Sequence, residues 1–331
     1  MDKLEILPPV QRLSERVLRV LGQNPGKFTL QGTNTYIIGL RAPYVLLDTG
    51  EGKPEYVPHL EDALKQLPES TNDTPLVSDI IISHEHRDHW GGLDSVLSLL
   101  RKLAQAKSSH SFHPPKIHKY PNQLDANLES YLKTLPLGSF VHTDNEFILH
   151  ELDEKETLRA GDTTLQIFHT PGHTDDSICI LLHEESALFT ADSVLGQGTA
   201  VFKDLKTYLA SLQKMLDVEV DGKAPFSTLY PGHGPVLHNG RKHIKEYIEH
   251  RLEREREILN VLRSPPINGG YATVMDIVSH IYAAYPQSLW QPASYGVHLH
   301  LLKLREESRV EEVPGPDIAE TKWKASSIAA L

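Results

Sequence analysis

Residues 83–92 of the chain read SHEHRDHWGG and follow directly on an apolar run, DIII, at residues 79–82. The apolar run is typical of a buried strand, and the two glycines favour a turn after it. Neutral imidazole and carboxylate, the groups gathered in this stretch, are the ligands that zinc and similar divalent ions prefer. The pattern therefore indicates a metal site at the end of a strand, against the alternative of a polar surface turn in a histidine-rich chain.

The spacing of the four polar side chains favours two adjacent ions over one. His84 and His86 point the same way along an extended backbone, because side chains alternate. Asp88 and His89 follow as the chain turns, so they can face the same cavity from another side. If this interpretation is correct, further ligands should come downstream, each on a loop after a strand.

Three downstream places have this arrangement of an apolar strand followed by a turn that carries a possible ligand. Each is also compatible with an ordinary turn, but their order along the chain strengthens the metal interpretation. They are His173 after residues 163–168, Asp192 after residues 187–191, and His233 in the segment of residues 229–235. A carboxylate such as Asp192 at the end of an apolar strand needs a partner if it is buried, and a metal ion would supply one.

Taken together, these residues resemble the metallo-β-lactamase superfamily, and further motifs resemble its lactamase-beta-2-like subfamily. The resemblance covers nearly the whole chain. Its motifs are VLGQNPG at 20–26, TLQGTNTY at 29–36, DTGE at 48–51, TPGHTDD at 170–176, YPGHGP at 230–235 and KWKA at 322–325. The resemblance implies an α/β fold, a four-layer αββα sandwich with the metal loops along one sheet edge, and a small C-terminal winged-helix-like helical domain.

The resemblance also implies a ligand set and a mechanism. One zinc would be bound by His84, His86 and His173, and the other by Asp88, His89 and His233, with Asp192 bridging both. Zinc lowers the pKa of bound water from 15.7 to about 7, so a hydroxide between the ions would attack the substrate. Asp88 is the candidate for orienting this nucleophile and moving its proton to the leaving group. Manganese or iron would also suit such a site.

Two further residues are candidates for roles around the metals. Asp48 ends the apolar run at residues 44–47, where it would orient a metal-bound histidine or else cap the following turn. Asn34 lies in TNTY at residues 33–36, and it would contact substrate, support a ligand or merely shape a turn. Large apolar side chains near these loops predict an apolar mouth: Phe28, Leu30, Trp90 and Phe202.

Composition restricts the class of protein. The chain of 331 residues has a formal net charge of −11, which gives no general attraction to nucleic acid or to an anionic membrane. The single cysteine, Cys179, excludes an internal disulfide, fits a reducing compartment and lies in an apolar run typical of a buried thiol. No apolar run is long enough to span a bilayer, and the N-terminus lacks a signal-peptide pattern, so we expect a cytoplasmic protein.

The pattern of elements predicts two domains, a catalytic domain at 1–240 and a helical winged-helix-like domain at 241–331. The second has a long charged helix, a helix capped by Thr273, a third helix through residues 297–304, and a wing strand near 309–313. A winged helix favours nucleic acid by analogy alone, and its many glutamates favour a wall of the active site or a docking surface instead. Residues 106–150 are a possible insertion, and residues 106–121 with their three histidines read as an exposed surface loop.

The resemblance predicts a metal-dependent hydrolase whose substrate stays open between two main alternatives. The first is a thioesterase that releases an aromatic polyketide from an acyl carrier protein domain of a polyketide synthase, in secondary metabolism. The second is an endoribonuclease that cuts single-stranded RNA. Net charge, the apolar mouth and the segment QNPGKF at residues 23–28 favour the thioesterase, and Glu85 weakens the RNA alternative. A glyoxalase II-like thioester hydrolase and a non-catalytic scaffold are weaker alternatives, and a secreted β-lactamase is disfavoured because no export signal is seen.

Overall fold

The computed structural model describes residues 4–68, 74–106, 112–121, 126–143, 149–219, 226–264 and 271–326. The chain divides into two compact units, which are described separately. The first unit is Met1–Val201 with Lys214–Ile244, and the second is Phe202–Gln213 with Lys245–Leu331. Two of the division points fall inside helices, so the domain boundary predicted at residue 240 stays a prediction. None of the helices in the described ranges is both long and apolar enough to cross a membrane.

The first unit contains a seven-stranded mixed sheet in which strand order follows chain order from β1 to β7. Its first four strands are antiparallel, and β4 to β7 run parallel to one another. The strands are β1 (Val10–Arg12), β2 (Val17–Leu21), β3 (Asn34–Ile38), β4 (Tyr44–Leu47), β5 (Val77–Ile82), β6 (Lys116–Lys119) and β7 (His150–Glu151).

A second sheet of six strands has the order β13-β12-β11-β10-β9-β8. Its strands are antiparallel except for the pair β11 and β12. They are β8 (Thr157–Ala160), β9 (Thr163–His169), β10 (Ile178–Leu182), β11 (Ala187–Ala191), β12 (Thr228–Pro231) and β13 (Leu237–His238). A short 3₁₀ turn, His183–Glu185, joins β10 to β11.

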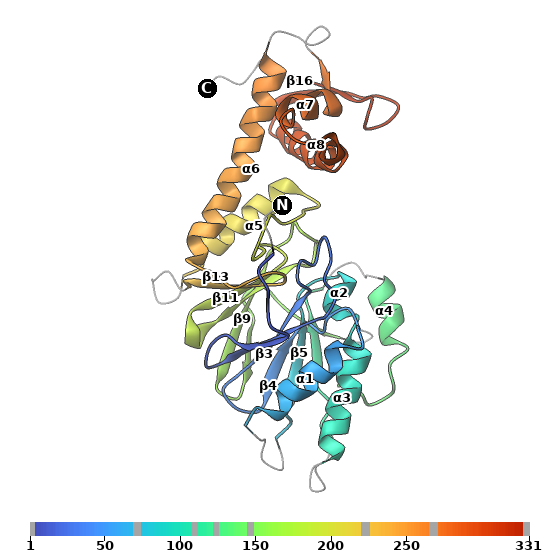
Figure 1. Ribbon diagram of the computed structural model, residues 1–331, viewed down its shortest axis with the longest axis vertical. Helices are drawn as coiled ribbons and strands as arrows, with labels where there is room; N and C mark the ends of the chain where they lie inside the picture. The colour runs from blue at the N-terminus through green and yellow to red at the C-terminus, as the bar shows by residue number, and fades with distance from the viewer. Residues whose placement is uncertain are drawn as a thin grey trace. The chain divides into compact units, whose positions relative to one another are not determined.

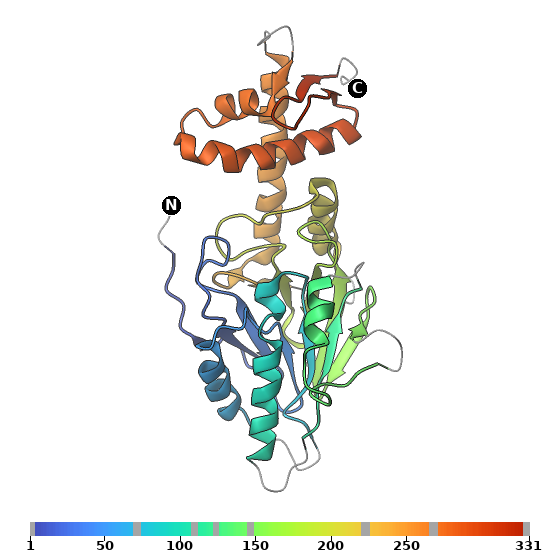
Figure 2. The ribbon, with the colours of Figure 1, turned by 90° about the vertical axis from the view of Figure 1, so that its right-hand side faces the viewer.

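Helices cover the outer face of the first sheet, as Figures 1 and 2 show for α1 (Tyr56–Lys65) and α3 (Leu93–Gln105). The short helices α2 (Arg87–Trp90) and α4 (Ala126–Leu132) belong to the same unit. In β5, Ile80 and Ile82 pack in the cluster that contains the apolar faces of α1 and α3, while Ile81 points to the opposite side. Burial on both faces explains why this strand is a continuous apolar run.

The two sheets face each other across an apolar core. Tyr36, Leu47 and Ile81 of the first sheet pack in one cluster with Ile167 and Phe189 of the second. Side chains of β3 and β11 meet directly, with the rings of Tyr36 and Phe189 5.1 Å apart edge to face. Because strand side chains alternate, this core uses every second residue of the central strands and leaves the others for the helical layers.

The outer face of the second sheet packs against the last turn of α5 (Leu205–Asp217) and the start of α6 (Gly240–Arg263). Cys179 of β10 is fully buried there, with its Sγ 3.9 Å from the sulfur of Met215. A Cβ atom at Gly240 would lie 2.5 Å from the side chain of Leu229, so α6 begins in close contact with β12. Burial raises the pKa of the Cys179 thiol to about 12, as expected of a structural cysteine. The expected αββα layering is confirmed.

The second unit has the predicted winged-helix pattern. It contains most of α6, then β14 (Ala272–Thr273), α7 (Val274–Ile281), a 3₁₀ turn (Gln287–Leu289), α8 (Trp290–Glu306), β15 (Val310–Val313) and β16 (Lys322–Ala325). The last two strands form an antiparallel hairpin, and β14 completes a three-stranded sheet. Thr273 caps α7 in a capping box with Asp276, which confirms the predicted cap. Trp323 is fully buried in the apolar core of this unit.

Two predictions about local structure were wrong. Residues 106–121 do not form an exposed loop throughout, because β6 is a buried strand of the first sheet. His118 bonds Asp79 through Nε2 at 2.7 Å and Lys119 is also buried, whereas His113 is exposed as predicted and residue 110 lies outside the described part. The sequence of residues 28–39 also predicts a strand over that whole segment, but β3 begins only at Asn34 and the residues before it form a loop.

Candidate metal centre

The predicted ligands lie on loops that follow four strands. Residues 84–89 follow β5, His173 lies in the loop after β9, Asp192 directly follows β11 and His233 follows β12. All seven predicted side chains come together in two groups whose possible ligand atoms lie within 4.8 Å of one another. The first group is His84, His86, His173 and Asp192, and the second is Asp88, His89 and His233.

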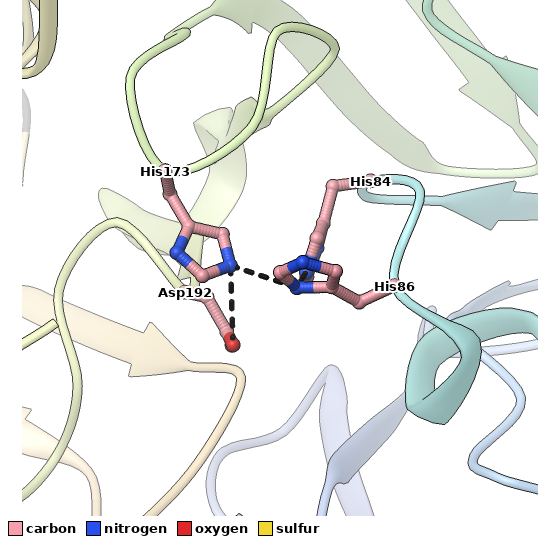
Figure 3. Close-up of side chains that lie close together, drawn as sticks. All are labelled: His84, His86, His173 and Asp192. Carbon is pink, nitrogen blue, oxygen red and sulfur yellow. Dashed lines mark hydrogen bonds and ion pairs between the residues drawn. The ribbon is translucent and has the colours of Figure 1, made fainter. Parts of the chain in front are cut away.

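Three imidazoles of the first group converge on one point, as Figure 3 shows. His86 Nδ1 lies 3.1 Å from His84 Nε2 and 3.0 Å from His173 Nε2. The carboxylate of Asp192 approaches from a third direction, with Oδ2 3.6 Å from His173 Nε2. The rings of His84 and His86 are nearly perpendicular, so their nitrogens rather than their faces meet.

Asp192 also contacts the second group, so one carboxylate lies between the two. Its Oδ2 is 3.2 Å from His233 Nε2, and its Oδ1 is 3.5 Å from His89 Nε2. Asp88 Oδ2 closes this group, 3.4 Å from His89 Nε2 and 3.3 Å from His233 Nε2. This is the arrangement that a carboxylate bridging two ions requires.

The donor atoms fit divalent metal ions in chemistry and in spacing. Ligands bound tetrahedrally at about 2.0–2.1 Å stand about 3.3 Å apart, which matches the separations within both groups. His89 Nε2 and Asp192 Oδ1 are buried atoms with no hydrogen-bond partner among the residues that the structure describes. Because buried polar atoms are nearly always bonded, these two atoms indicate a site built for a cation.

Two histidines of the first group, His84 and His86, are held in the neutral form. Burial and the neighbouring His89 lower the pKa of His84 well below its ordinary value, and burial and His173 lower the pKa of His86. Imidazole binds metal only in its neutral form. These two ligands can therefore bind a cation without first losing a proton.

Charge is distributed differently in the second group. Burial alone would lower the pKa of His89, but three neighbouring carboxylates outweigh it and hold the pKa well above its ordinary value. Burial is likewise outweighed at His233, where Asp192 is the main cause that raises the pKa to about 9. Burial would raise the pKa of Asp192, yet His233 and His89 hold it well below its usual range. The carboxylates of Asp88, Asp48 and Asp192 therefore favour positive charge at His89 and His233, and a bound cation would supply that charge in place of the protons.

Asp48 contacts His89, as the predicted role of orienting a histidine would require. Its Oδ2 lies 2.7 Å from His89 Nδ1, which leaves Nε2 directed at the metal position. Ser83 fixes the carboxylate by donating from its backbone N to Oδ1 and from its hydroxyl to Oδ2, both at 2.8 Å. Such a carboxylate sets the tautomer and ring orientation of a ligand histidine.

Thr33 holds Asp88 in the same way. Its hydroxyl donates to Asp88 Oδ2 at 3.0 Å, and Asn24 bonds both the hydroxyl and the backbone N of Thr33. Thr33 and Asn24 lie within the sequence motifs, but the motifs did not indicate this role for them. Ser83 was not identified from the sequence either. Thr33 directly follows Gly32, which is a signal that could have marked it, whereas Asn24 and Ser83 have no glycine next to them.

Asn34 supports the loop of His233. Its buried amide donates to the carbonyls of Pro231 and Gly234, both at 2.9 Å. These bonds explain its location at the start of β3, and whether it also meets substrate stays a prediction. Gly232 lies in the same loop, where a Cβ atom would come 2.3 Å from Asp192 Oδ1, so no larger residue fits beside this ligand.

The predicted apolar mouth is wrong for two of its four residues. Trp90 is buried in the core of the first unit and donates from Nε1 to the carbonyl of Glu85. Phe202 is buried in the second unit, stacked with Tyr208. Phe28 is 68% exposed, which leaves it free to meet a substrate or partner, and Leu30 is half-buried. Large apolar residues near a site in sequence were a poor guide because the helices need them for packing.

Comparison with known proteins agrees with this geometry. Residues 28–233 match the family profile described as the metallo-beta-lactamase superfamily, and residues 273–323 match the beta-lactamase associated winged helix domain. A Caenorhabditis elegans protein named beta-lactamase-like protein 2 homolog is 37% identical over 328 residues, 99% of this chain and 96% of that protein. A Claviceps purpurea protein named atrochrysone carboxyl ACP thioesterase is 34% identical over 282 residues, 85% of this chain and 76% of that protein.

Solved structures show the same fold at low sequence identity. A beta-lactamase domain protein from Burkholderia ambifaria superposes with a TM-score of 0.68 at 16% identity, covering 97% of this chain and 96% of that one. A metallo-beta-lactamase family protein from Thermus thermophilus gives 0.62 at 20% identity, covering 97% and 99%. Because the family profile spans all seven predicted ligands, the chain belongs to the metallo-beta-lactamase superfamily and carries its associated winged helix domain.

Proposed function

We propose that the chain is a two-metal hydrolase that cleaves an acyl thioester carried on an acyl carrier protein. The family and the cluster of histidines and aspartates support a metal-dependent hydrolase. When bound, two divalent ions would polarise the substrate and lower the pKa of water in the site. The observation that carries the proposal is Asp192, whose single carboxylate contacts ligands of both groups.

The chain's own residues have distinct tasks in this proposal. The histidines of the two groups would hold the ions, and Asp192 lies between the two groups. Asp88 is the residue that would accept and pass on a proton, because its carboxylate is partly exposed, 21%, while Thr33 and His233 hold it in place. Burial would raise the pKa of Asp88, but His89 and His233 hold it far below its usual range, so the carboxylate is ionised at neutral pH.

Thioesters are the favoured substrate class because fungal relatives bear that activity in their names. Three such proteins, named atrochrysone carboxyl ACP thioesterase, are 33–34% identical to this chain over 84–88% of its length. The net charge of −11 also disfavours a polyanionic substrate. An aromatic polyketide on a carrier protein is therefore the substrate and partner that we propose, with zinc as the first metal to test.

Single-stranded RNA is the second candidate, and the winged helix domain is the observation that favours it. Winged helices commonly bind nucleic acid, although the fold alone does not fix that role. Near the wing, Glu306, Glu307 and Glu311 are exposed, which would repel phosphates. The RNA alternative therefore needs a basic surface that these residues do not provide.

A side-by-side turnover assay tests the proposal. Zinc-loaded or manganese-loaded protein is given an aromatic acyl thioester on a carrier protein in one arm and a single-stranded RNA in the other. We expect acid release in the first arm, and its loss in Asp88→Asn and Asp192→Asn. RNA cleavage with an inert thioester would replace the thioesterase by the ribonuclease, and activity that survives Asp192→Asn would contradict the two-metal hydrolase altogether.

A further inference from the structure

A buried ion pair lies beside the first metal group. Lys119, the last residue of β6, bonds through Nζ to Asp176 Oδ2, and the two side chains are only 10% and 0% exposed. Asp176 lies in the loop after β9, three residues beyond His173. Lysine is rarely buried this far unless it is paired, so the pair has a specific role in this part of the fold.

The second oxygen of Asp176 connects the two loops that carry the first group. Asp176 Oδ1 accepts from the backbone N of Glu85 at 3.2 Å and from the hydroxyl of Thr174 at 2.7 Å. Glu85 lies between His84 and His86, and Thr174 directly follows His173. One carboxylate therefore touches the immediate neighbours of three ligand histidines.

The position of β6 explains why a lysine is found here. β6 is parallel to β5, and Lys119 is the register partner of Ile82, the residue two before His84. A lysine at the carboxyl end of β6 thus lies beside the end of β5, where it bonds Asp176 of the loop after β9. A buried carboxylate is unfavourable without a counter-charge, and Lys119 supplies that charge to Asp176.

We propose that Asp176 and Lys119 are positioning residues for the first metal ion. Asp176 clamps the two loops together so that His84, His86 and His173 converge, and Lys119 balances the clamp's charge. The inference rests on the proposed metal-dependent function but not on the identity of the substrate. It assigns a role to a lysine in a segment whose sequence reads as a surface loop.

Paired neutral substitutions test the clamp without leaving a lone buried charge. Lys119→Met with Asp176→Leu removes the clamp, whereas Lys119→Met with Asp176→Asn keeps an amide oxygen that can accept from Glu85 and Thr174. Thr174→Val is a milder variant that removes one clamp bond. Lys116→Met and Asp175→Asn are matched controls, because both residues are exposed neighbours of the pair in sequence.

The measurement is the affinity of each variant for two equivalents of Zn²⁺, by competition with a chromophoric chelator. We expect the Met–Leu variant to weaken one binding step by about 10–100-fold and to leave the other unchanged, as when a supporting contact of a ligand is lost. The Met–Asn variant should bind within about threefold of wild type, and the controls should match it. Visible spectra of the Co²⁺-loaded variants identify the weakened site as the one rich in histidine.

Other outcomes overturn the proposal. Wild-type Zn²⁺ affinity in the Met–Leu variant would make the pair a packing feature only. A raised KM with unchanged Zn²⁺ affinity would make Lys119 a substrate contact instead. If the Met–Leu variant does not fold, unchanged Zn²⁺ affinity in Thr174→Val would likewise make the pair a packing feature only. Failure of the proposed function is seen separately, because wild-type protein would then bind no Zn²⁺ or release no acid.

Discussion

At the scale of single residues, the site combines groups that sequence can reveal with groups that it cannot. Histidines and aspartates at ligand spacing were recognisable because few other functions place three imidazoles within six residues after a buried strand. Thr33, Ser83 and Asp176 were not, because hydroxyls and carboxylates in turns usually satisfy backbone groups. What they contact is decided by chain segments far away in sequence, which no local pattern contains.

Asp192 is the residue whose loss should affect both ions. Asp192→Asn keeps the size of the side chain but removes the charge that the two groups share, so we expect bound metal to fall from about two ions per chain to one or fewer. Turnover should fall by about 10²-fold or more, because the proposed activation of water uses both ions. Elemental analysis of protein purified without chelator measures the number of bound metal ions. Asp62→Asn, on the exposed side of α1, is the control. Two ions in the variant would contradict the bridging role.

Asp48 allows a cleaner test of the second group. It has a left-handed backbone with φ of 61°, a conformation that Asn adopts nearly as easily as Asp, so Asp48→Asn should fold without added strain. We expect one Zn²⁺ to bind about 10–100-fold more weakly, because His89 loses the carboxylate that fixes its ring. Titration with a chromophoric chelator should show the other binding step unchanged. Equal weakening of both steps would mean that Asp48 stabilises the whole site rather than His89.

At the scale of elements, strands with uniform apolar character and capped helices could be predicted, and polar strands could not. The strand β5 and the cap of α7 agree with their sequence patterns because burial and capping are local requirements. The strand β6, with the sequence KIHK, was mistaken for part of a loop. Its buried His118 and Lys119 pair with Asp79 and Asp176. Because these partners are distant in sequence, the sequence of the strand alone does not predict the pairing.

Helix α8 makes a prediction about pH. His300 of α8 is buried near Phe202, and burial lowers its pKa to about 3, while the unfolded chain keeps the ordinary value near 6.5. Between these values the unfolded state binds the extra proton, so stability falls as pH falls below about 6.5, by at most about 1.4 kcal/mol per pH unit. Urea unfolding at pH 5.0 and 7.5 should show a smaller loss in His300→Leu than in wild type. An equal loss in both would show that His300 does not titrate in this range.

At the scale of the whole molecule, the chain joins a candidate metal site to a winged helix unit. The seven predicted ligands all lie in the first unit, between residues 84 and 233. The second unit depends on its own apolar core around Trp323. Metal should therefore affect the stability of the two units differently.

Removal of metal tests this division directly. An ion that binds the folded state alone stabilises it by about 4 kcal/mol when its free concentration is a thousand times its Kd. We expect a chelator to lower the melting temperature of the first unit by several degrees and to leave that of the second unit unchanged. A single thermal transition should then separate into two, or, if two are already seen, only the transition of the first unit should shift. Calorimetry with and without Zn²⁺ measures the melting temperatures of the two units. The Asp192→Asn variant should melt like chelator-treated wild type at any Zn²⁺ concentration that leaves its weakened site empty. If both units shift together, they unfold as one body, and the second unit contributes to the stability of the metal site although it supplies none of its ligands.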